Sequence, residues 1–109
     1  MKKRRLGNRA FCAALMLALA TGGTAGTEDF RAMMSDAMAR MHVAMQVPFT
    51  GDADRDFARM MIPHHQGGID MALVELRYGK DDRLKRLAQE IIVAQKQEIE
   101  VMHLALREN

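Results

Sequence analysis

Methionine recurs at helical spacing in one segment of this chain. Met34, Met38, Met41 and Met45 follow one another at intervals of four, three and four residues. Residues three or four apart lie on one face of an α-helix, whereas a strand places every second residue on the same face. The spacing therefore predicts a helix that carries a stripe of thioether side chains.

Two breaks divide the remainder into further helical segments. A Val-Pro-Phe-Thr-Gly stretch at positions 47–51 ends the first apolar pattern, and Gly79 ends the second. The predicted helices run from Thr27 to Gln46 with Thr27 as the N-cap, from Asp52 or Asp54 to Gly79, and from Asp81 or Asp82 to the C-terminus. The sequence shows no strand pattern, and short breaks favour antiparallel neighbours. We predict an all-α antiparallel helical bundle.

The second predicted helix is apolar over most of its circumference, which makes it the most buried of the three. The third has a single apolar stripe with Gln95 at its centre and Glu98 beside it. Three helices form a thin core, and small domains of this kind often need a metal, a partner or self-association. We therefore predict a homodimer that completes a four-helix core.

The first 26 residues have the pattern of a cleavable signal peptide. Four basic residues at positions 2–5 precede an apolar run from Ala10 to Ala20 and a stretch of small residues up to Gly26. The run is too short for a membrane span, so no stable insertion is expected after cleavage. We predict a periplasmic or secreted protein whose domain covers residues 27–109.

Removal of residues 1–26 changes the charge and the cysteine count. The segment carries five of the sixteen Lys and Arg residues and none of the fourteen acids, so the mature chain has a net charge of −3. The basic character of the precursor therefore gives no support for nucleic-acid binding. Cys12 is removed as well, which leaves neither a disulfide nor a thiolate ligand.

Histidines follow methionines at one helical turn. His42 lies four residues after Met38, and His64 and His65 each lie four residues after a methionine, Met60 and Met61. Thioether and imidazole donors without thiolate suit a soft ion such as Cu(I). Met packing in a core and ordinary hydrogen-bonded histidines are the alternatives. Because adjacent helical residues point about 100° apart, His64 and His65 are not expected to share one ion.

Three further features bear on the site. Met71 lies seven residues after His64, and Met102-His103 repeats the pairing of donors near the C-terminus. Gln95 and Glu98 are polar within an apolar stripe, which fits either the orientation of a ligand imidazole or an ordinary interhelical hydrogen bond.

Two other metal motifs fail. The acids at positions 52, 54 and 56 begin like a calcium loop, but Phe57 and Pro63 stand where glycine and glutamate belong. Glu100 and His103 match one Glu-x-x-His element of a di-iron bundle, without a second copy. No nucleophile–base arrangement or phosphate-binding loop is recognisable, so we expect no enzyme. A di-iron oxidase remains the least favoured candidate.

With these residues in view, the chain resembles a known family. Asp-Phe-x-x-x-Met-Ile-Pro-His-His-Gln at positions 56–66, Ile-Asp-Met-Ala at 69–72 and Ala-Gln-x-x-Glu-Ile-x-x-Met at 94–102 resemble the signature of domain-of-unknown-function family 305. This family includes secreted copper-binding proteins of the CopM type. The resemblance implies a ferritin-like bundle that binds Cu(I), with Ag(I) as a second candidate ion.

The resemblance also assigns positions to the expected site. It places His64, His65, Met61, Met71 and Met102 among the metal ligands, with Gln95 and Glu98 as their polar partners. Spacing alone adds Met60, Met38, His42 and His103. The expected function is to sequester or carry Cu(I) and to release it to another copper-handling protein. The alternative is an interaction module without metal that docks a protein partner on a Met-rich face.

Overall fold

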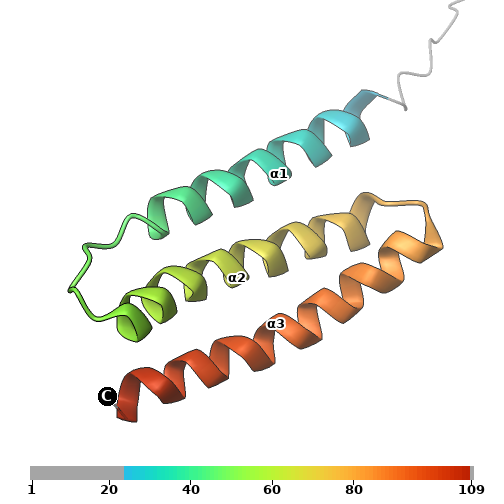
Figure 1. Ribbon diagram of the computed structural model, residues 1–109. Coiled ribbons are helices and arrows are strands. Elements are labelled where there is room, and N and C mark those ends of the chain that lie inside the picture. The colour runs from blue at the N-terminus through green and yellow to red at the C-terminus, as the bar shows by residue number, and fades with distance from the viewer. Residues whose placement is uncertain (1–23, 109) are drawn as a thin grey trace, which may run out of the picture.

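Three helices lie side by side in the computed structural model, which describes residues 24–108 (Figure 1). They are α1 (Thr24–Ala44), α2 (Ala53–Tyr78) and α3 (Asp82–Glu108). The central helix α2 packs against both neighbours, whereas no described residues of α1 and α3 have Cα atoms within 8 Å of each other. The predicted all-α antiparallel bundle is confirmed, in the form of an open layer.

Helix α1 differs from its predicted bounds at both ends. It begins at Thr24, so Thr27 lies inside the helix and the predicted N-cap is wrong. Nothing in the Thr-Ala-Gly sequence before Thr27 prevents helical backbone. The helix ends at Ala44 rather than Gln46, because the backbone tightens there: the N–H of Gln46 bonds the Val43 oxygen and that of Val47 bonds the Met45 oxygen. Of the predicted signal peptide, residues 1–23 lie outside the described residues.

The turn before α2 is organised by two aspartates. Asp52 is the N-cap of α2, and its carboxylate accepts the backbone N–H of Arg55 at 2.8 Å. Asp56 is buried and turns back toward the loop, where it accepts the N–H and the hydroxyl of Thr50, each at 2.8 Å, and the N–H of Gly51 at 3.0 Å. Gly51 has a positive φ of 92°, a conformation that favours glycine. These contacts fix where the loop joins α2.

Adjacent glycines in the middle of α2 allow both neighbours to approach closely. Met41 of α1 lies where a Cβ on Gly67 would be, with its sulfur 2.5 Å from that position. The amide oxygen of Gln95 of α3 lies where a Cβ on Gly68 would be. Since successive helical residues point in different directions, one glycine serves each seam of the layer.

Most of the buried residues belong to α2, as predicted. The described apolar side chains that are buried are small for the most part: Ala37, Ala58, Ile69, Ala72, Val74, Ala88 and Met102. Helix α2 continues through Pro63, which lacks the N–H for one helical hydrogen bond. Within the described residues, no helix is long and apolar enough to cross a membrane.

Candidate metal site

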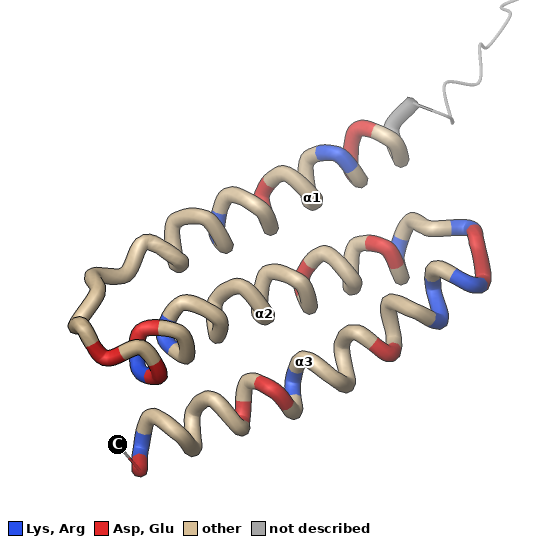
Figure 2. The backbone as a smooth tube through the Cα atoms, viewed as in Figure 1, with Lys and Arg blue, Asp and Glu red and all other residues tan. Residues whose placement is uncertain are grey.

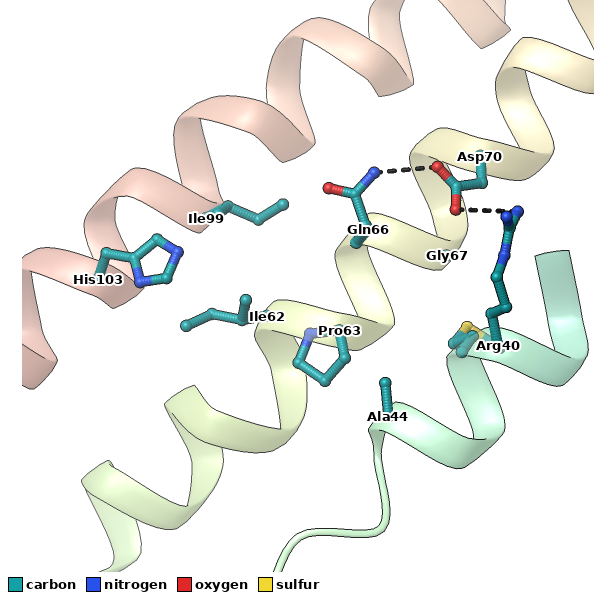
Figure 3. Close-up of a pocket in the computed structure, with 10 residues that line it drawn as sticks. Arg40, Ala44, Ile62, Pro63, Gln66, Gly67, Asp70, Ile99 and His103 are labelled. Carbon is teal, nitrogen blue, oxygen red and sulfur yellow. Dashed lines mark hydrogen bonds and ion pairs between the residues drawn. The ribbon is translucent and has the colours of Figure 1, made fainter.

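Because its neighbours flank α2 on opposite sides, the layer has two open sides. One of them, the charged side, is defined by Asp36 and Arg40 of α1 and Asp70 and Arg77 of α2, which line a shared groove. The Arg40 guanidinium lies 3.3 Å from the Asp36 carboxylate and 3.5 Å from that of Asp70. The Gln66 amide also donates to Asp70, at 2.9 Å (Figure 3). Polar groups on this side are therefore paired largely with one another.

A second groove of about 440 Å³ continues along the charged side and reaches α3. His103 and Ile99 face Ile62 and Pro63 across it in the close-up (Figure 3). The predicted ligand His103 therefore lies on the charged side, and it is exposed. Met41, in the seam between α1 and α2, is the thioether that also lines this groove.

The opposite side of the layer, the methionine side, carries most of the remaining donors. Gly68 and Met71 line a groove there with leucines of α3. His64 is four residues before Gly68 and shares its side of α2, whereas Met34, Met38 and Met45 lie on the flank of α1 opposite Arg40. The residues that define the methionine side are Met34 and Met38 of α1 with Met45 directly after it, His64, Met71 and Glu75 of α2, and Leu84, Leu87 and Ile91 of α3.

The register of α1 against α2 sets one methionine level with His64. Met41 packs on Gly67, and the two helices run antiparallel. One turn beyond Met41 lies Met45, directly after the end of α1, and its N–H still bonds the Met41 oxygen at 2.9 Å. Nearly one turn back along α2 lies His64, so these two residues are at about the same level of the seam. Met60 is one turn before His64 on its own helix. By register and spacing, His64 therefore shares its level of the molecule with one thioether beyond α1 and lies one turn from another on α2.

Sequence reasoning placed Met45 in the stripe but did not include it among the candidate ligands. Met45 follows Met41 by four residues, just as Met38 follows Met34, so sequence spacing gave Met45 the same support as Met38, which was included. The antiparallel register distinguishes the two, because it sets Met45 level with His64. Met38 itself is 42% exposed, and the buried centre of the α1 stripe is Ala37.

The two adjacent histidines have different surroundings. The Nδ1 atom of His65 lies 2.9 Å from the backbone oxygen of Met61, and its Nε2 atom lies 2.7 Å from the Glu98 carboxylate. The side chain of His65 is 14% exposed. The ring of His64, with its centroid 5.9 Å from that of His65, is exposed and makes no hydrogen bond within the described part of the chain.

This difference decides which imidazole is free for a ligand. Both nitrogens of His65 face oxygen acceptors, an arrangement that suits donation from both and links α2 to α3. A metal ligand instead needs an unprotonated nitrogen with an available lone pair. His64 can offer one without breaking a contact. Glu98 does contact an imidazole, as the sequence analysis allowed, but that imidazole belongs to His65.

The seam between α2 and α3 holds the other motif residues. Gln95 meets Gly68, and Glu98 meets His65 one turn further along α3. The same antiparallel register sets Met102, which is buried, level with Met61. The amide oxygen of Gln95 is buried and has no hydrogen-bond partner among the described residues.

The structure thus distributes the predicted ligands over four places. His64, Met60, Met71 and Met38 lie on or beside the methionine side, and Met61, His65 and Met102 lie in the α2–α3 seam. His103 lies on the charged side. His42 lies one turn past Met38 at the outer edge of the methionine side; it is exposed, and its Nδ1 atom lies 3.1 Å from the backbone oxygen of Met38. Within residues 24–108, no three His, Cys, Asp or Glu side chains group as metal ligands.

Two comparisons with known proteins match this chain. Residues 12–106 match a family described as Domain of unknown function (DUF305). An uncharacterized protein, L153 of Acanthamoeba polyphaga mimivirus, is 40% identical over 55 residues, which are 50% of this chain. The matched segment spans 36% of the length of that viral protein.

Proposed function

The chain belongs to the DUF305 family, and from that premise we propose that it binds Cu(I) through methionine and histidine and keeps it available for transfer. Ag(I), which prefers the same soft donors, is the second candidate ion. The proposed setting is the periplasm or the outside of the cell. The chain binds and releases the ion and catalyses no reaction of its own.

The observation that carries the proposal is the position of His64. It is an exposed imidazole without a hydrogen-bond partner among the described residues, level with Met45 and one turn from Met60. Met71 lies on the same side of α2, two turns further on. Thioethers with one imidazole, and no thiolate, suit a soft monovalent ion better than a hard cation. When bound, Cu(I) would be held by His64 and neighbouring methionines.

His65 and Glu98 have a positioning role in this proposal. Their contact joins α2 to α3 directly beside His64 and fixes the orientation of the helix that carries it. Exchange among adjacent thioethers would keep the ion mobile, which suits delivery to another copper-handling protein.

The test is an anaerobic titration of the protein with Cu(I) against a chromophoric chelator. We expect His64→Ala to weaken Cu(I) binding by about 10-fold or more, because even an outer partner is worth that much. The matched control is His103→Ala, which removes an exposed histidine from the charged side and should leave affinity unchanged. Equal losses in both variants, or wild-type protein that does not compete with the chelator, would refute the proposal.

A second candidate function is a docking surface without metal. It is favoured by the exposure of Met38 and by the adaptability of methionine side chains. In that case His64→Ala would leave binding of the protein partner largely unchanged, whereas substitution of Met38 and Met71 by aspartate would abolish it.

A further inference from the structure

The methionine side exposes large apolar side chains to solvent. Leu84 and Leu87 of α3 are 52% and 50% exposed, and Phe57, seven residues before His64 on α2, is 58% exposed. Beside the leucines runs the groove that contains Met71, with a volume of about 340 Å³. Contiguous apolar surface of this kind usually marks an interaction site. The charged side differs, because the Arg40–Asp70 ion pair joins α1 to α2 there, beside the exposed Met33 and Leu73.

The layer buries few large side chains. Four of its seven buried apolar residues are alanines. Among the described residues, no large side chain is fully buried, and Met102 is still 8% exposed. Small domains bury a limited fraction of their surface and often complete their core by association. A partner packed on the methionine side would bury the large apolar side chains that the three helices leave exposed.

Charge also singles out the middle of α2. No Lys, Arg, Asp or Glu occurs between Arg59 and Asp70, and charged residues gather toward the ends of this helix (Figure 2). At the edge of the methionine side, Glu98 is paired with His65. Two copies that meet across residues 60–69 of α2 would therefore bring no charged side chains of this stretch together, whereas Glu75 lines the groove one turn past Met71.

We propose that a second copy of this chain packs on the methionine side and forms a symmetric dimer. Whatever packs on the methionine side must be available each time the chain folds, and a second copy of the same chain meets this condition. The same surface offers both projecting leucines and a groove, so one patch can serve both partners, as a two-fold interface requires. In this dimer, the self-association predicted from the sequence takes place through the methionine side.

The dimer also closes the copper site, a consequence that rests on the proposed function. Within one chain, α1 and α2 contribute donors to the methionine side, whereas α3 contributes Leu84, Leu87, Ala88, Ile91 and Gln95 to its groove, and His64 is exposed. The surface above His64 is therefore open in a single chain. A second copy excludes water from it and brings a second set of thioethers to the same interface.

The first test is the mass of the metal-free full chain at micromolar concentration by analytical ultracentrifugation. We expect twice the mass of one chain. A monomer overturns the proposal, as does an indefinite series of larger species, because a symmetric interface is closed. A monomer that becomes a dimer after removal of residues 1–23 also overturns it, since the N-terminal segment would then be the cover.

A pair of leucine substitutions locates the interface. Leu87→Glu should give a monomer, whereas Leu104→Glu, on the outer side of α3 and 47% exposed, should remain a dimer. Circular dichroism checks that both variants keep their helices. If Leu87→Glu unfolds, the same pair is repeated with Leu→Gln. Dissociation of both variants, or of neither, would place the interface elsewhere.

The Cu(I) titration separates this inference from the proposed function. A metal-free dimer that takes up no Cu(I) keeps the interface and refutes copper binding. A monomer that competes with the chelator keeps copper binding and refutes the interface. If both hold, Leu87→Glu should bind Cu(I) about 10-fold more weakly, the smallest effect typical of loss of an outer shell around a metal.

Discussion

At the scale of single residues, Asp56 ties the loop between α1 and α2 to the start of α2. Its carboxylate accepts hydrogen bonds from the backbone and hydroxyl of Thr50 and from the backbone of Gly51. The Thr50 N–H, first among these donors, holds the pKa of Asp56 below its ordinary value of 3.8. The charged form is therefore favoured in the folded state, so this contribution to stability is present at neutral pH and is lost as the pH falls through the folded pKa.

Asp56→Asn should consequently lower the melting temperature at pH 7, with a difference from wild type that shrinks below about pH 4, where the unfolded carboxyl becomes protonated. Thermal unfolding followed by circular dichroism between pH 2 and pH 7 measures this. The control is Asp54→Asn, which removes an exposed acid from the same helical turn and should have little effect. Parallel curves for wild type and Asp56→Asn would show that the loop contacts contribute nothing through charge.

The adjacent histidines show what a motif can and cannot predict at this scale. Their spacing correctly indicated that His64 and His65 point in different directions, and Glu98 does meet an imidazole. Which histidine Glu98 meets depends on the register of α3 against α2, and no local pattern contains that register. The loop partners of Asp56 are likewise set by the folded turn and are not visible in its sequence position.

At the scale of elements, the ends of α2 and α3 follow from local chemistry and were predictable. Asp52 caps α2 through its side chain, and Asp81 accepts the N–H of Arg83 at the start of α3. The seams were less predictable, because hydrophobic periodicity assigns a face to a helix but does not identify its neighbour. Met45 was missed as a candidate ligand for this reason. The role of Gly67 also depends on the neighbouring helix, since the residue in contact belongs to α1.

The two central glycines should respond differently to alanine. A Cβ at Gly67 would lie 2.7 Å from the Cβ of Met41, an atom that moves only if α1 moves. We expect Gly67→Ala to destabilise the fold by about 1–3 kcal/mol, despite a gain of about 1 kcal/mol in helix propensity. At Gly68 the obstacle is the flexible end of Gln95, which can rotate away, so Gly68→Ala should be close to neutral.

Urea denaturation of the two glycine variants measures this difference, and each variant serves as the control for the other. Displacement of α1 in Gly67→Ala should also separate Met45 from His64 and weaken Cu(I) binding. If Gly67→Ala were as stable as Gly68→Ala, the close approach of α1 to α2 would not contribute to the fold.

At the scale of the whole molecule, the same open layer has to expose metal donors and also bury apolar surface. The charged side carries the Arg40–Asp70 ion pair, whereas the methionine side is apolar around Met71 and carries the exposed His64. If the methionine side stays exposed so that its thioether and imidazole donors can bind an ion, the apolar side chains on that side stay unburied and the core is incomplete. Metal binding and association are therefore expected to act on the same surface, and each should stabilise the fold.

Cu(I) should accordingly raise the melting temperature of the protein, because a ligand that binds only the folded state stabilises it. At a free concentration 100 times the dissociation constant, the gain is about 2.7 kcal/mol. Anaerobic thermal unfolding with and without Cu(I) measures the shift, which His103→Ala should retain and His64→Ala should largely lose. A shift of equal size in both variants would mean that Cu(I) acts away from the methionine side. An unchanged or lower melting temperature in wild type would mean that the unfolded chain, with its eleven methionines, binds the ion at least as well as the folded layer does.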